Sequence, residues 1–137
     1  MRVTIVVRAG WLVQAAAVLP VPVALAASPA ELLASYSAQV RVPASPERGE
    51  KLCNTNFGRP LGLSCASCHG DVPTKYGRDD VIGKATNALA PAFNPARFTD
   101  KSKVDCAFQM NCRDVVGREC TAAEKAGVLS WLMSLKT

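Results

Sequence analysis

The chain has 137 residues, a formal net charge of +5, 49% hydrophobic residues and 20% charged residues. This length allows one small domain and excludes a large multidomain enzyme. The positive charge is modest and no basic run is interleaved with aromatic residues, so no nucleic-acid partner is expected. We interpret the charge as a solvated surface that favours docking of an acidic protein partner.

Residues 1–26 have the pattern of a secretory signal peptide. Arg2 and Arg8 precede a long apolar run, and Ala24-Leu25-Ala26 is a cleavage signal of the A-x-A type. An uncleaved membrane anchor is the alternative, because the apolar run approaches the length of a membrane span. A glycine and two prolines weaken such a helix. We therefore expect cleavage after Ala26, a periplasmic protein, and no membrane span after cleavage.

Two helix starts follow the predicted cleavage site. Ser28-Pro29-Ala30-Glu31 combines an N-cap serine, a proline at the first helical position and a glutamate at capping-box spacing. A proline-containing linker follows, so residues 27–44 are predicted to form an N-terminal helix and linker. Ser45-Pro46 begins the main domain, residues 45–137, with a helix from Glu47 to about Asn54.

The motif Cys65-Ala66-Ser67-Cys68-His69 is typical of covalent haem attachment. Cysteines three apart share a face of a helical turn, so both thiols can add to the vinyl groups on one porphyrin edge. A zinc half-site needs a second Cys/His pair, whereas His69 is the only histidine. A redox dithiol needs a βαβ pattern, which does not follow. We expect one haem c, attached to Cys65 and Cys68, with His69 as the proximal iron ligand.

The remainder of the domain reads as a loop and two helices. Residues 72–95 contain three prolines and no clear period, which predicts a loop around the edge of the haem. Thr99 is expected to cap a third helix. Thr121-Ala122-Ala123-Glu124 is a second capping box and opens a terminal helix. Its apolar residues recur at helical spacing: Val128, Trp131, Leu132 and Leu135.

No convincing strand is present, so the predicted fold class is all-α. We expect a small helical domain similar to class I cytochromes c, built around one covalently attached haem that fills the core. Gly49 and Trp131 are expected to meet where the second and terminal helices cross, because glycine lets a large ring approach the backbone. This crossing is similar to that of the terminal helices in class I cytochromes c.

Four cysteines remain beside the two in the haem motif. Cys112 and Cys120 are close in sequence, with Gly117 between them to turn the chain, which allows a local disulfide. Cys53 and Cys106 each lie in a helical pattern. The residues alone leave open whether these two pair or stay free.

The sixth position on the iron decides what a c-type haem does. A thioether fills it and gives a low-spin electron carrier, whereas an empty or weakly held position binds small gases. Two methionines follow the predicted cleavage site, Met110 and Met133. Met133 lies inside the terminal helix, where a core or surface role is expected. Met110 lies 41 residues beyond His69, a separation that class I cytochromes also use, so the residues alone favour Met110.

A wider pattern of motifs runs through most of the chain, from about Ser28 to Leu135. The motifs occur in this order: Ser45-Pro46-Glu47-Arg48-Gly49-Glu50, Cys65-Ala66-Ser67-Cys68-His69, Gly83-Lys84, Leu89-Ala90-Pro91, Asn94-Pro95-Ala96-Arg97-Phe98-Thr99-Asp100, Asn111-Cys112 and Gly117-Arg118-Glu119-Cys120-Thr121. Together they closely resemble the sphaeroides haem protein family of high-spin cytochromes c. The segment from Arg97 to Thr121 is the most specific part of the resemblance.

The resemblance implies a periplasmic monohaem protein whose distal ligand is the asparagine just before the first cysteine of a disulfide. That ligand falls on Asn111, and the disulfide falls on Cys112 and Cys120. An amide oxygen is a hard, weak-field ligand that suits ferric iron and is poorly held by ferrous iron. Reduction is therefore expected to release Asn111 and open the iron to oxygen, nitric oxide or carbon monoxide. The resemblance also implies a multihaem or membrane-linked cytochrome as electron donor.

Three positions depart from the family pattern. Cys53 stands where an aromatic is usual, Cys106 where a charged residue is usual, and Met110 where a basic residue usually precedes the ligand. A low-spin electron carrier ligated by Met110 therefore remains the alternative function. Nothing in the sequence supplies a distal histidine or carboxylate for peroxidase chemistry. A monomeric electron-transfer or gas-binding protein is thus favoured over a dedicated enzyme.

Overall fold

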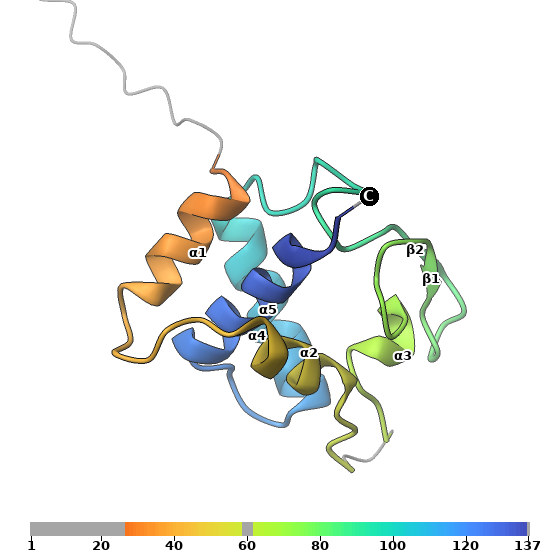
Figure 1. Ribbon diagram of the computed structural model, residues 1–137. Helices are drawn as coiled ribbons and strands as arrows, with labels where there is room; N and C mark the ends of the chain where they lie inside the picture. Colours follow the sequence, from red (N-terminus) through yellow and green to blue (C-terminus); the bar gives the residue numbers. More distant parts are fainter. Residues whose placement is uncertain (1–26, 59–61, 137) are drawn as a thin grey trace, which may run out of the picture.

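The computed structural model describes residues 27–58 and 62–136 (Figure 1). The predicted signal peptide, residues 1–26, lies outside the described residues. Within the described ranges, no helix has the length and apolar character needed to cross a membrane. The elements in chain order are α1 (Pro29–Ser37), α2 (Pro46–Asn54), α3 (Ala66–His69), β1 (Gly77–Arg78), β2 (Ala85–Thr86), α4 (Lys101–Val115) and α5 (Ala122–Ser134).

Three helices begin where the sequence predicts. The side chains of Ser28, Ser45 and Thr121 each accept a hydrogen bond from the backbone N–H three residues further on. Both predicted capping boxes are complete, because Glu31 and Glu124 each accept from the N–H of the cap residue. These bonds satisfy backbone donors that the first helical turn leaves without an internal partner.

The N-terminus of α4 differs from the prediction by one residue. Thr99 is the predicted cap, but Asp100 holds that place, and its carboxylate accepts from the N–H of Lys103 at 3.1 Å. Thr99 instead donates its hydroxyl to the carbonyl of Ala96, at 3.0 Å. A carboxylate at the cap gains from the helix dipole as well as from the hydrogen bond, and this favours Asp100 over the threonine hydroxyl.

Helix α5 lies at the centre of the helical part and packs against α2 and α1 (Figure 1). The α2–α5 crossing is a backbone contact: a Cβ added to Gly49 would lie 2.1 Å from the carbonyl oxygen of Gly127. The close crossing expected at Gly49 is present, and the nearest atoms to that position belong to the backbone of Gly127 and Val128 rather than to the ring of Trp131. Trp131 is buried one turn further along α5, in the same cluster as Cys53.

Two clusters of buried side chains share α5. The first joins α1, α4 and α5 through Tyr36, Val104 and Leu129, and the second joins α2 and α5 through Cys53 and Trp131. The phenyl rings at positions 98 and 108 pack against both clusters, so they connect the two halves of the core. The predicted all-α class is confirmed in the described residues.

One short element departs from the purely helical expectation. Strands β1 and β2 form an antiparallel pair in which Gly77 lies opposite Thr86 and Arg78 opposite Ala85. Two residues per strand are too few for an alternating apolar pattern, so the sequence carries no signal for this hairpin.

Replacing Gly49 by alanine is expected to lower the free energy of unfolding of the haem-containing protein by about 3 kcal/mol, since a new methyl would overlap the α5 backbone. Gly127→Ala is the matched control. Its Cβ would meet its nearest atoms at 3.3 Å, so we expect a change within about 1 kcal/mol. Denaturant unfolding of both variants measures the difference. A smaller loss for Gly49→Ala than for Gly127→Ala would contradict the crossing.

Candidate functional site

The predicted haem motif forms the single helical turn α3. Ser64 and Ser67 start this turn with reciprocal bonds: each hydroxyl oxygen accepts from the other residue's backbone N–H, at 3.1 and 3.2 Å. Gly70 ends it with a φ of 78°, a left-handed conformation that glycine adopts without strain. Cys65, Cys68 and His69 are therefore held on one compact turn, as the spacing of the motif predicts.

The β1–β2 hairpin packs directly on α3 (Figure 1). A Cβ on Gly77 would lie 2.2 Å from the carbonyl oxygen of Cys68, so this position tolerates only glycine. Thr86 donates its hydroxyl to the same carbonyl at 2.9 Å. Residues from both strands of the hairpin therefore hold Cys68, the second cysteine of the motif. The sequence does not predict this role, because Gly77 and Thr86 lie 9 and 18 residues beyond Cys68 and such distant contacts leave no local pattern.

The predicted loop of residues 72–95 folds back on itself beside the motif. The buried Pro73 accepts hydrogen bonds through its carbonyl from the N–H groups of Leu89 and Ala90. Arg97 donates to the carbonyl of Ala88 at 3.2 Å and to that of Asn87 at 3.2 Å. These hydrogen bonds satisfy backbone carbonyl groups of the irregular segment and hold it in one conformation. A loop that lies next to a functional site needs such support to position its residues.

His69 has the properties of a metal ligand. Its ring atom Nδ1 is buried and has no hydrogen-bond partner within the described part of the chain. Burial, and then the positive charge of Arg97, lower the pKa of His69 below its ordinary value, while Asp79 opposes them. A neutral imidazole with an unpartnered nitrogen is the form that binds iron. A buried polar atom without a partner otherwise costs free energy, so this observation fits a haem ligand.

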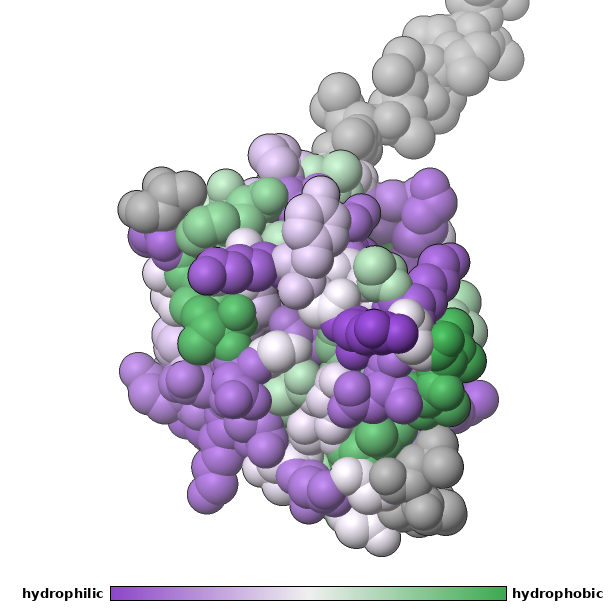
Figure 2. All heavy atoms as spheres, turned by 90° about the vertical axis from the view of Figure 1, so that its right-hand side faces the viewer, coloured by the Kyte–Doolittle hydropathy of each residue, from purple (hydrophilic) through white to green (hydrophobic). Residues whose placement is uncertain are grey.

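Large apolar side chains are exposed along the segment after the motif: Val72, Tyr76, Val81, Ile82 and Phe93. Figure 2 shows hydrophobic patches among hydrophilic side chains on the face that carries α3 and the hairpin. Exposed apolar residues gathered in one region indicate a surface that is covered in the working molecule. The apolar edge of a haem attached to α3 would supply such cover, so the residues present fit this group.

The two cysteines left open by the sequence are both free thiols in the structure. Cys53 is 4% exposed and packs against Cys65, the first cysteine of the motif. The neighbouring thiol of Cys65, together with burial, raises the pKa of Cys53 above its ordinary value. Cys53 therefore stays a neutral thiol in the core. Cys106 lies on the exposed face of α4.

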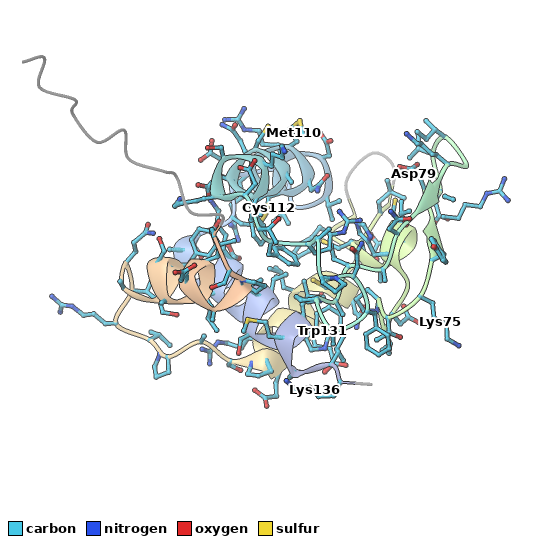
Figure 3. All side chains as sticks on the ribbon, turned by 90° about the horizontal axis from the view of Figure 1, so that it is seen from above. Lys75, Asp79, Met110, Cys112, Trp131 and Lys136 are labelled. Carbon is cyan, nitrogen blue, oxygen red and sulfur yellow. A yellow bond between two sulfur atoms is a disulfide. The ribbon has the colours of Figure 1, made fainter. Side chains whose placement is uncertain are left out.

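The predicted distal residues all lie on α4 and the turn that follows. The structure joins Cys112 and Cys120 in a disulfide, which is the pairing that the family resemblance implies. Met110 is 55% exposed, and Figure 3 shows it on the outer side of α4. Asn111 is also exposed, and within the described residues its side chain makes no hydrogen bond. The structure thus presents two neighbouring candidates on one helix.

The chain is similar to known proteins along most of its length. It matches, over residues 39–132, the family described as "Domain of unknown function (DUF1924)". Cytochrome c-type protein SHP of Cereibacter sphaeroides is 43% identical over 107 residues, which is 77% of this chain and 82% of that protein. The match over residues 39–132 includes α2 to α4, the haem motif and the disulfide.

Solved structures agree with the sequence comparison. The structure described as oxidized SHP, an oxygen binding cytochrome c, superposes with a TM-score of 0.73 at 42% identity, over 79% of this chain and 97% of that chain. The solution structure of Methylophilus methylotrophus cytochrome c″, described as giving insight into haem-ligand detachment, has a TM-score of 0.68 at 32% identity. It covers 80% of this chain and 94% of that chain.

Covalent attachment can be assigned to particular cysteines by acid–acetone extraction. The native protein should keep its haem, while the double variant Cys65→Ala/Cys68→Ala should either lack haem or release it, because no thioether can form. The matched control is Cys53→Ala/Cys106→Ala, which also removes two free thiols and should keep its haem. Release of the haem by this control would contradict the assignment.

Peptide mapping without reduction tests the disulfide. We expect one linked peptide pair that contains Cys112 and Cys120, while Cys53 and Cys106 are alkylated as free thiols after denaturation. Alkylation of Cys112 or Cys120 before reduction would show that the pairing is wrong.

Proposed function

From the membership of this chain in the SHP family, the sphaeroides haem proteins, we propose that its haem iron binds small gases once a weak distal ligand leaves. The members of this family are monohaem c-type cytochromes. This chain carries haem c, covalently attached. The solved relative is described as an oxygen binding cytochrome c. We extend oxygen binding to this chain, with nitric oxide and carbon monoxide as further ligands.

We assign the attachment to Cys65 and Cys68 and the proximal position to His69. The compact turn of α3 and the unpartnered ring nitrogen of His69 support this assignment. When bound, the haem supplies a redox-active iron with one axial position left for a second ligand. The residues of the hairpin hold the motif in place, and the exposed apolar side chains after it provide a surface to cover the porphyrin.

The helical phase of α4 is the observation that favours Asn111 over Met110 as the distal ligand. Each residue advances a helix by about 100°. Asn111 therefore lies two turns beyond the buried Val104, on the same side of α4, with its own side chain exposed. Met110 instead shares its face with Lys103, whose side chain is 85% exposed. Since both positions belong to one continuous helix ending at Val115, a rotation that brings Met110 inward would expose Val104.

The chemistry of the amide ligand connects this geometry to gas binding. A hard amide oxygen stabilises ferric iron more than ferrous iron, so Asn111 competes well in the oxidised protein and poorly in the reduced one. The disulfide from Cys112 to Cys120 begins at the next residue and limits how far the released side chain moves. Ligand detachment is described for the similar cytochrome c″, and we propose it for this chain.

Export and a redox partner complete the proposal. The pattern of residues 1–26 and a disulfide in the folded domain both suit an oxidising, periplasmic compartment. There the protein would act as a monomer and receive electrons from a multihaem or membrane-linked cytochrome, as expected from the sequence resemblance.

Optical spectra of three proteins test the distal ligand. Ferric native protein should be high-spin or mixed-spin, without a methionine-to-iron charge-transfer band, and the ferrous form should bind carbon monoxide readily. Asn111→Ala should change the ferric spectrum and leave the haem attached, whereas the neighbouring control Met110→Ala should change it little. A low-spin ferrous spectrum that ignores carbon monoxide, abolished by Met110→Ala, would establish the electron-carrier alternative instead.

A further inference from the structure

Glu119 bridges two residues of α4 that flank Asn111. It lies in the turn between α4 and α5, and one carboxylate oxygen accepts from Gln109 Nε2 at 3.2 Å and from Arg113 Nη2 at 2.6 Å. Gln109 precedes Asn111 by two residues, and Arg113 follows it by two. The same turn is joined to α4 through Cys112 by the disulfide of Cys120. Two different bonds therefore connect this turn to one short stretch of helix.

The carboxylate holds α4 from the side opposite Asn111. Two residues advance a helix by about 200°, so Gln109 and Arg113 point almost directly away from Asn111. A bond on that side does not compete with Asn111 for its own contacts. It instead sets how far the helix, and with it Asn111, can move toward or away from the core.

A pocket of about 320 Å³ lies beside this part of α4 and is open to solvent. Gln109, Glu119 and Cys120 line it, together with Lys125 from α5. Gln109 and Glu119 are themselves exposed, so this side of α4 lacks the close packing that holds an interior helix in place. The carboxylate bonds therefore cross a region where packing alone does not fix the helix.

We propose that Glu119 is a positioning residue that keeps Asn111 close to the iron in the oxidised protein. This inference rests on the proposed role of Asn111 as distal ligand. Without the carboxylate, the stretch from Gln109 to Arg113 is held less firmly to the turn, and the effective concentration of the Asn111 amide at the iron falls. External ligands of ferric iron then compete more successfully. The ferrous protein is unaffected, because Asn111 has already left.

Ligand titrations of the haem-containing variant Glu119→Gln test this role. Imidazole should bind the ferric variant about two- to fivefold more tightly than the native protein, the range that the loss of one exposed ion pair allows. Carbon monoxide should bind the ferrous forms of both proteins equally. High salt should remove most of the ferric difference, because it screens the native ion pair.

Two further variants separate the possible outcomes. Asp114→Asn removes an exposed negative charge from α4 without touching the bridge, so it should leave imidazole affinity unchanged. In an Asn111→Ala background, Glu119→Gln should have no effect. The positioning role would be overturned if Glu119→Gln changed the ferric affinity for imidazole and the ferrous affinity for carbon monoxide equally. It would also be overturned if the change in imidazole affinity persisted in the Asn111→Ala background, or if Glu119→Gln did not change imidazole affinity at all. If Asn111→Ala itself leaves the ferric spectrum and imidazole affinity unchanged, the proposed distal ligand is wrong.

Discussion

Contact between the backbones of α2 and α5 at Gly49 and Gly127 determines where the rest of the domain lies. Because no side chain separates the helices there, Cys53 and Trp131 come together one turn further on. Cys53 in turn packs against Cys65, so the crossing also sets the position of the haem motif relative to the helical core. The opposite side of α5 receives α1 and α4, which places the predicted distal helix on the same support.

The two segments to which we assign the iron ligands are held by different means. Turn α3, the proposed proximal side, is short and is fixed by its caps, by the hairpin and by the folded loop that follows it. The proposed distal segment belongs to a long helix beside a pocket open to solvent, and a disulfide and an exposed carboxylate tie it to the next turn. A proximal side with many fixed contacts and a distal side held at a few points suit the proposed ligand, which leaves and returns with the oxidation state of the iron.

Local signals in the sequence predicted local structure well. Serine and threonine caps marked the starts of α1, α2 and α5, and the C-x-x-C-H motif marked the turn to which we assign the haem. At the start of α4 the cap is Asp100 rather than the expected Thr99, because a carboxylate gains more from the helix dipole than a hydroxyl does. At the α2–α5 crossing, the residue expected to meet Gly49 is Trp131, whereas the nearest backbone is that of Gly127.

Contacts between distant residues could not be predicted from one sequence. The positions of Gly77 and Thr86 on Cys68, of Cys53 beside Cys65, and of Glu119 across α4 depend on how the elements pack. The choice between Met110 and Asn111 depends partly on a local sequence signal and partly on the structure. Their spacing alone favours the methionine, and the phase of a helix that continues to Val115 favours the asparagine.

Crystal structures of the haem-containing protein in the oxidised and reduced states test the central claim most directly. We expect the side-chain oxygen of Asn111 to coordinate the ferric iron and the ferrous iron to be five-coordinate, with α4 displaced and His69 unmoved. Coordination of the iron by the sulfur of Met110 in both states would contradict the proposed distal ligand.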